Sequence, residues 1–139
     1  MIARRRPGST RGVNRSAAAV RGHLAGDATP GDLSALEAWK ARKGDCSEHA
    51  NLLCAALRIA GIPARVELGF VYAGALGGWG GHAWVSAYDR ETRRWLQLDA
   101  AYPGISRGCY LRTGSPGGAA LDGGVSTLLG GTVEVVPGG

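Results

Sequence analysis

The chain has 139 residues, enough for one domain around one hydrophobic core with little left for a second. Its net charge of +5 comes from 16 Lys and Arg against 11 Asp and Glu. Five of the arginines precede residue 16, where no acid occurs, so the remainder balances 11 basic against 11 acidic residues. This distribution does not argue for a basic nucleic-acid face on the folded part, and three cysteines are unlike a secreted disulfide framework.

Residues 1–16 are predicted to form a disordered basic arm, because arginine, glycine, serine and proline leave almost nothing to bury. The folded domain is expected over 17–139, where residues 17–24 form a short helix at most. The next helix is expected to begin with Thr29 as N-cap and Pro30 at the first helical position, and to end near Arg42.

A further helix is predicted to begin at Cys46. Asp45 is a strong N-cap residue, and Glu48 three positions later completes a capping box. Apolar residues then recur at helical spacing until Gly61 and Pro63 end the helix. Cys46 therefore lies in the first turn, where free N–H groups and the helix dipole favour the reactive thiolate. The alternative is that Cys46 is a small buried apolar residue.

The second half of the chain has the composition of β-strands. Alternating β-formers predict strands over 66–72, 82–89 and 94–99, and 132–136 suits a last edge strand. The glycine-rich residues 73–81 are expected to form a mobile loop. Two helices followed by an antiparallel meander predict an α+β fold, with the helices packed on one side of a small sheet.

A nucleophilic thiol needs a base within hydrogen-bond reach and a third group to orient that base. If the last two strands of the meander form a hairpin centred between residues 90 and 91, His82 lies opposite Asp99 on one face of the sheet. With Cys46 packed against that face, His82 would take the thiol proton and Asp99 would orient the ring.

Other assignments of the histidines and cysteines stay open. His23 precedes the expected folded part and has no partner in view. His49 shares roughly one helix face with Cys46 and is an alternative base. Cys54 lies on the apolar stripe of the helix and is expected in the core, whereas Cys109 has no assigned place. A zinc site that combines the two helix cysteines with His49 and His82 lacks the spacing of the paired zinc motifs, so we expect no metal and no cofactor.

Four stretches of the chain resemble blocks of the transglutaminase-like superfamily, whose members are papain-like in architecture. They are Gly-Asp-Cys-Ser-Glu-His-Ala over 44–50, Ala-Leu-Arg-Ile-Ala-Gly-Ile-Pro-Ala-Arg over 56–65, His-Ala-Trp-Val over 82–85 and Trp-Leu-Gln-Leu-Asp-Ala over 95–100. The best-matched core spans 33–103, and a glycine-rich part follows over 104–139. The resemblance implies acyl transfer by a Cys-His-Asp triad, with Cys46 as nucleophile, His82 as base and Asp99 as orienting acid.

The resemblance also bears on the substrate cleft. The Cys46 backbone N–H would be one oxyanion donor, and the second is not identified, with Trp39 as one candidate. The loop just before His82 is expected to cover the cleft and shape substrate choice; it comprises Trp79, Gly80 and Gly81. The chain departs from the family's commoner residues at Ser86, Ala100 and Ala101.

These features predict thiol-dependent acyl transfer on peptide or glutamine-type amides, with hydrolysis by a protease or amidase favoured over crosslinking. The alternative is a transglutaminase-like fold with a weak or inactive site that serves as a binding or assembly module. The expected partner is a peptide or protein substrate; nucleic-acid binding would rest on the N-terminal arginines alone. Because no signal peptide or long apolar run is present, a cytoplasmic protein without membrane contact is the default expectation.

Overall fold

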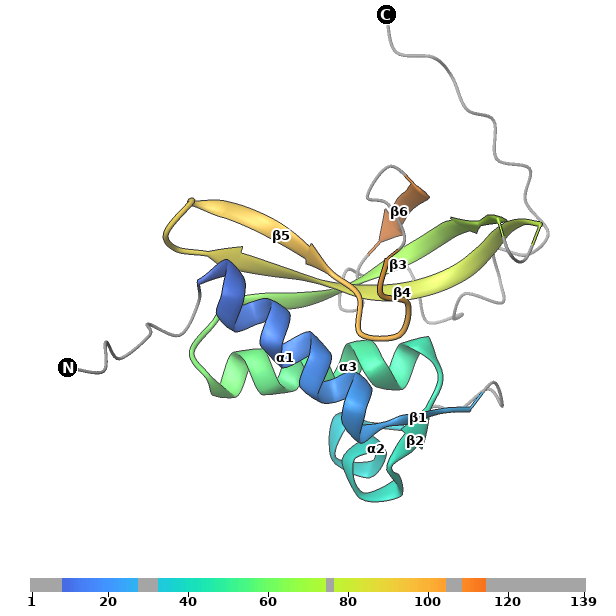
Figure 1. Cartoon of the computed structure of the whole chain (residues 1–139), viewed down its shortest axis with the longest axis horizontal. Helices are drawn as coiled ribbons and strands as arrows, with labels where there is room; N and C mark the ends of the chain where they lie inside the picture. The colour runs from blue at the N-terminus through green and yellow to red at the C-terminus, as the bar shows by residue number, and fades with distance from the viewer. Residues whose placement is uncertain (1–8, 28–32, 75–76, 105–108, 115–139) are drawn as a thin grey trace, which may run out of the picture.

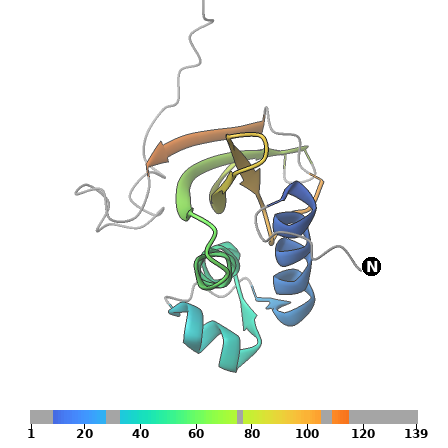
Figure 2. The ribbon, with the colours of Figure 1, turned by 90° about the vertical axis from the view of Figure 1, so that its left-hand side faces the viewer.

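A computed structural model describes residues 9–27, 33–74, 77–104 and 109–114 (Figure 1). In chain order the elements are α1 (Thr10–His23), β1 (Ala25–Gly26), α2 (Ala35–Ala41), β2 (Lys43–Gly44), α3 (Cys46–Ile59), β3 (Ala64–Ala73), β4 (Gly78–Asp89), β5 (Arg94–Leu98) and β6 (Tyr110–Gly114). The helices lie on one side of a four-stranded sheet, with α3 beneath the strands (Figure 2). The predicted α+β architecture is confirmed. None of the described helices is long and apolar enough to cross a membrane.

The sheet has the strand order β5-β4-β3-β6, and every neighbouring pair is antiparallel. The expected three-stranded meander is therefore present as β3, β4 and β5. Strand β6 was not expected; it pairs with β3 on the edge opposite β5. The strand predicted over 132–136 lies outside the described residues. Strands β1 and β2 form a separate parallel pair next to the N-terminus of α3.

The expected loop over 73–81 is wrong for its second half, because residues 78–81 belong to β4. Glycine is a weak strand former by itself, yet here its backbone pairs fully with β3, and Tyr72 faces Trp79 across the two strands. The two rings meet edge to face with their centroids 5.5 Å apart. Trp79 and Gly80 are thus strand residues rather than members of a mobile cover.

The N-terminal part also differs from the expectation. Helix α1 begins at Thr10, so residues 10–16 are helical and the disordered arm does not extend to residue 16. Ser9 caps the helix by accepting a hydrogen bond from the amide of Gly12. One face of α1, with Val13, Ala17 and Val20, is buried. Three apolar residues at helical spacing therefore suffice to dock an arginine-rich helix, since arginine itself is a good helix former.

Helix α2 is shorter than predicted. It begins at Ala35 with Ser34 as N-cap, and Glu37 completes a capping box with that serine. The predicted start at Thr29 and Pro30 lies outside the described residues.

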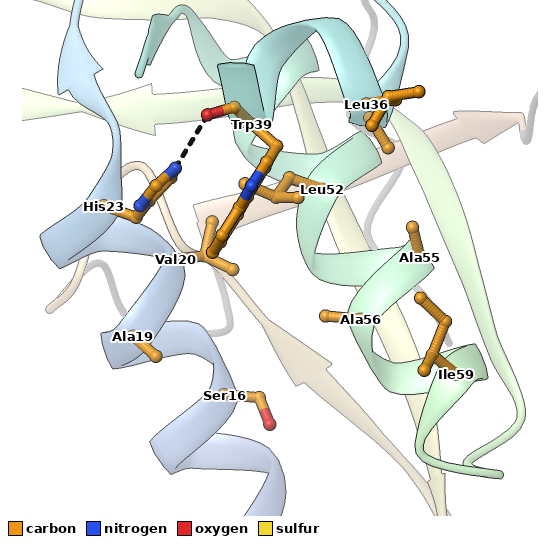
Figure 3. A pocket seen from close by; sticks show the side chains of 11 residues that line it. Ser16, Ala19, Val20, His23, Leu36, Trp39, Leu52, Ala55, Ala56 and Ile59 are labelled. Carbon is orange, nitrogen blue, oxygen red and sulfur yellow. Dashed lines mark hydrogen bonds between the residues drawn. The ribbon is translucent and has the colours of Figure 1, made fainter. Parts of the chain in front are cut away.

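Helix α1 meets α2 through a pair of rings. Nε2 of His23 donates to the carbonyl oxygen of Trp39 at 2.9 Å, and the rings stack with centroids 3.8 Å apart. The expectation that His23 has no partner is therefore wrong. Both rings line an apolar cavity of about 670 Å³ between α1, α2 and α3 (Figure 3).

The core lies between α3 and the sheet. Leu53 and Leu57 of α3 are fully buried together with Val85 of β4. Cys54 belongs to the same apolar cluster, as expected, and burial raises the pKa of its thiol despite the nearby charge of Arg58. Gly61, at φ +75°, then turns the chain from α3 toward β3. This packing fixes the N-terminus of α3 relative to the strands.

Candidate active site

The predicted capping box at the start of α3 is confirmed, and it places Cys46 at the first helical residue. Oδ1 of Asp45 accepts from the amide of Ser47 at 2.7 Å, and Oε2 of Glu48 accepts from the amide of Asp45 at 2.8 Å. Oε1 of Glu48 also accepts from the amide of Leu33 at 3.1 Å. This one buried carboxylate therefore ties the chain before α2 to the end of α3 that carries the thiol.

Asp45 caps three amides of the first turn of α3. Asp45 satisfies the amides of Ser47 and Glu48 through its side chain and that of His49 through its carbonyl oxygen. Among the described residues, the amide of Cys46 has no such partner in the cap. A backbone N–H beside a nucleophile is the kind of donor that stabilises an oxyanion.

Strands β4 and β5 bring a histidine and a carboxylate together. Nε2 of His82 lies 2.6 Å from Oδ2 of Asp99, and the two side chains are 1% and 7% exposed. The expected register is nevertheless wrong by two residues, since Val85 faces Leu98. The connection comprises residues 90–93, as the predicted strand bounds require, so the hairpin is centred between residues 91 and 92 and not between 90 and 91. Asp89 Oδ1 accepts from the amide of Glu91 within this connection at 2.8 Å.

The contact survives the register error for a geometric reason. Side chains alternate between the faces of a sheet with a period of two, so a slip of two residues leaves them on the same face. His82 and Asp99 become diagonal instead of direct neighbours, a spacing that long side chains bridge.

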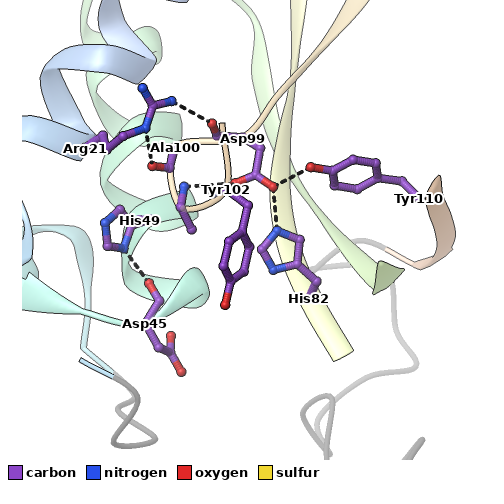
Figure 4. A network of polar contacts seen from close by, with 9 residues as sticks. Arg21, Asp45, His49, His82, Asp99, Ala100, Tyr102 and Tyr110 are labelled. Atoms are coloured by element: carbon purple, nitrogen blue, oxygen red, sulfur yellow. Dashed lines mark hydrogen bonds and ion pairs between the residues drawn. The ribbon is translucent and has the colours of Figure 1, made fainter. Parts of the chain in front are cut away.

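Asp99 accepts four hydrogen bonds from the described residues (Figure 4). Oδ2 accepts hydrogen bonds from Nε2 of His82 and from the hydroxyl of Tyr110, each at 2.6 Å. Oδ1 accepts hydrogen bonds from the amides of Ala101 and Tyr102, each at 2.9 Å. Burial alone would raise the pKa of Asp99, but these donors and the charge of His82 lower it. Asp99 is therefore ionised. A carboxylate has about four acceptor positions, so the four hydrogen bonds occupy all of them.

Helix α1 holds the backbone at the same point. Nη2 of Arg21 donates to the carbonyl oxygen of Asp99 and Nε donates to that of Ala100, both at 3.2 Å (Figure 4). The turn after β5 is thus fixed by a side chain far away in the sequence. This turn presents the Asp99 carboxylate to the histidine.

The His82 ring interacts with both Asp99 and Cys46, and it lines one cleft together with Cys46. Burial by itself would lower the pKa of His82, but its contacts with Asp99 and with Cys46 outweigh burial and raise that pKa to about 9. Since Asp99 occupies Nε2, Nδ1 is the nitrogen available to the thiol.

The raised pKa of His82 predicts a specific pH dependence of stability. The ring has an ordinary pKa of 6.5 and about 9 in the folded protein, so its stabilisation is complete below about pH 6.5 and is lost as the pH rises through 9. We expect the free energy of unfolding to fall by about 3 kcal/mol over that interval. Urea unfolding at a series of pH values measures it.

Two glutamine substitutions serve as comparisons for this measurement. The decline should disappear in His82→Gln and persist in His23→Gln, whose ring contacts Trp39 outside the site. A wild-type protein whose stability stays flat between pH 6.5 and 10 would contradict the assignment of the ring as a buried cation.

A cleft of about 520 Å³ opens onto this group of side chains. Its walls include Gly81, Arg21 and Tyr102, and the Tyr102 ring lies 5.1 Å from the His82 ring between centroids. His49, the alternative base, also lines the cleft, but its Nδ1 donates to the carbonyl oxygen of Asp45 at 2.7 Å.

The remaining predicted residues lie elsewhere. Trp39 is not among the residues that line the cleft, so the structure does not support it as the second oxyanion donor. Of the expected covering loop, Gly81 alone lines the cleft. Cys54 lies in the core, and no described cluster of three or more His, Cys, Asp or Glu is arranged to hold a metal ion.

Sequence reasoning missed Arg21 and Tyr110. Arg21 lies in the segment treated as preceding the best-matched core, and nothing distinguishes it from other arginines of α1. Tyr110 follows a glycine- and proline-rich stretch. The only signal there is the short run of β-formers at the start of β6.

Comparisons with known proteins agree with this fold. A candidate cysteine protease from Cytophaga hutchinsonii is similar at 21% identity and a TM-score of 0.64, over 75% of this chain and 35% of that one. Calcium-bound LapG from Legionella pneumophila is similar at 17% identity and a TM-score of 0.54, over 74% of this chain and 62% of LapG. Another LapG structure gives 19% identity and a TM-score of 0.52, over 77% and 66%.

The chain thus spans about a third of the first protein and less than two thirds of LapG. No curated protein sequence matches it significantly. The family comparison matches residues 2–100, a span that includes Cys46, His82 and Asp99. Taken with the capped cysteine helix and the antiparallel sheet, this match shows that the chain belongs to the transglutaminase-like superfamily.

Proposed function

We propose that this chain is a thiol-dependent acyl-transfer enzyme that hydrolyses peptide or glutamine-type amides. Cys46 is the nucleophile, His82 the general base and Asp99 the acid that orients it. The observation that carries the proposal is the His82 ring, which has one nitrogen on Asp99 and the other available to the Cys46 sulfur.

The proposed reacting form is the Cys46 sulfur paired with the His82 imidazolium, whose Nδ1 holds the thiol proton, the form that the raised pKa of this ring favours. The sulfur bonds to the amide carbonyl carbon, and the Cys46 amide donates to the developing oxyanion. The tetrahedral intermediate collapses by breaking the C–N bond. The imidazolium returns its proton to the departing ammonia or amine, and a thioester remains on Cys46.

Water completes the cycle. His82 removes a proton from the water as its oxygen attacks the thioester, the C–S bond breaks, and the carboxylic acid leaves with the thiol regenerated. An amine in place of water would give a new amide, which is crosslinking. Hydrolysis is favoured because one structural neighbour is a candidate cysteine protease.

The test is turnover of a set of glutamine-containing peptides, followed by release of ammonia and by new peptide termini. We expect Cys46→Ser to lose about 10⁴-fold or more in turnover. Cys109→Ser is the matched control, since Cys109 is not among the cleft residues and should keep wild-type turnover.

Mass spectrometry of the quenched reaction should show the acyl thioester on Cys46 in the wild type only. Adding a lysine analogue separates hydrolysis from crosslinking through the product formed. If the Cys46→Ser variant turned over the same peptides as fast as the wild type, the nucleophile would be wrong. A wild type that binds such peptides without turnover would favour the binding-module alternative.

A further inference from the structure

Tyr110 reaches the proposed triad from a separate strand. It lies at the start of β6, which pairs with β3 and not with either strand that carries the triad. Its ring packs against Trp84 with centroids 5.1 Å apart and against His82 at 6.0 Å. From there the hydroxyl donates to Oδ2 of Asp99 at 2.6 Å (Figure 4).

The hydroxyl shares this oxygen with the histidine. His82 Nε2 and the Tyr110 hydroxyl are each 2.6 Å from Oδ2, whereas Oδ1 is held by backbone amides alone. Rotation of the carboxylate would therefore break contacts with Tyr110 and with the backbone at once. Burial and the charge of Asp99 raise the pKa of Tyr110, so the phenol stays protonated and acts as a donor.

Two donors on one oxygen also divide its charge. The negative charge on Oδ2 stabilises the His82 imidazolium, and a second donor on the same atom weakens that stabilisation. A phenol in this position thus acts on the basicity of the histidine while touching neither the thiol nor the substrate cleft, whose lining residues do not include Tyr110.

We propose that Tyr110 is a positioning residue of the proposed reaction, one that holds the Asp99 carboxylate toward His82 and limits how strongly Asp99 favours the imidazolium. The effect that we expect on turnover rests on the proposed function. Its physical content, the action of one hydroxyl on the Asp99–His82 pair, does not require a substrate.

Tyr110→Phe tests the inference, because it removes the hydroxyl and keeps the ring that packs against Trp84. We expect the midpoint of the His82 ring titration, followed by NMR of the free protein, to move to higher pH. We also expect kcat to fall by about tenfold, the value of one charge-assisted hydrogen bond, while KM stays unchanged. The alkaline limb of kcat/KM should follow the titration upward.

Tyr88→Phe is the matched control, since Tyr88 lies on the same sheet with its ring against Trp95 and has no contact with Asp99. It should leave the titration midpoint and kcat at their wild-type values. A Tyr110→Phe protein that is folded and has an unchanged or lower titration midpoint would overturn the inference. If the wild type turned over no amide, the proposed function would fail, and the titration would still decide what Tyr110 does.

Discussion

Replacing His82 by alanine is expected to remove the selective reactivity of Cys46 toward iodoacetamide at neutral pH. In the wild type the His82 ring, which Asp99 orients, is the proposed acceptor of the thiol proton. Without the ring the thiol has no such base. Alkylation of Cys46 should therefore slow, and turnover of an amide should fall by about 10⁴-fold or more.

The measurement is a time course of the Cys46 adduct by peptide mass spectrometry, normalised to the folded fraction. His23→Ala is the matched control, because His23 stacks on Trp39 away from the cleft and its loss should leave the labelling rate unchanged. Labelling of Cys46 at the same rate with and without His82 would show that the thiol is not activated by this histidine.

The second large effect is expected from Asp99→Asn. The native carboxylate accepts two hydrogen bonds on each oxygen, and an amide keeps only one of these oxygens. If the oxygen stays on the amides of Ala101 and Tyr102, the new NH₂ group points at the donors of His82 and Tyr110. In the opposite orientation it points at the two backbone amides.

Either orientation leaves two buried donors facing a donor, so the substitution acts on both stability and activity. We expect a loss of about 2–4 kcal/mol in the free energy of unfolding from these unsatisfied groups. Turnover per folded molecule should fall by about 10⁴-fold, because His82 loses its orienting acceptor and its stabilised cation.

Asp89→Asn separates the two effects. Asp89 also accepts hydrogen bonds, from the hydroxyl of Thr10 and from the backbone amides of Glu91 and Thr92. It lies at the other end of β4. Its variant should lose stability while keeping its turnover per folded molecule. Full activity in the Asp99→Asn protein would show that His82 works without this carboxylate.

The cysteine helix could be predicted from sequence because its determinants are local. Asp45 and Glu48 lie within three residues of each other, and their capping box depends on little beyond the helix itself. The pairing of His82 with Asp99 was predictable for a different reason. The predicted register was wrong by two residues, but both side chains were predicted on the same face of the sheet, and this decides whether they meet.

The features that were missed depend on contacts between distant segments. Residues 78–81 read as a loop from their glycines, and they form a strand because β3 supplies a partner for every backbone group. The helical state of residues 10–16 depends on docking against α3. Arg21 and Tyr110 gain their roles only when helix α1 and strand β6 reach the turn after β5, which no local pattern indicates.

The Arg21–Asp99 hydrogen bond spans 78 residues, and it has a consequence for the chain during synthesis. The cap at the start of α3 can form as soon as that helix exists, whereas the contact between His82 and Asp99 requires non-local strand pairing, which is slow to form. Under the proposed function, a nascent or partly folded chain therefore carries Cys46 without its base. The proposed attack on amides would begin only once these long-range contacts have formed.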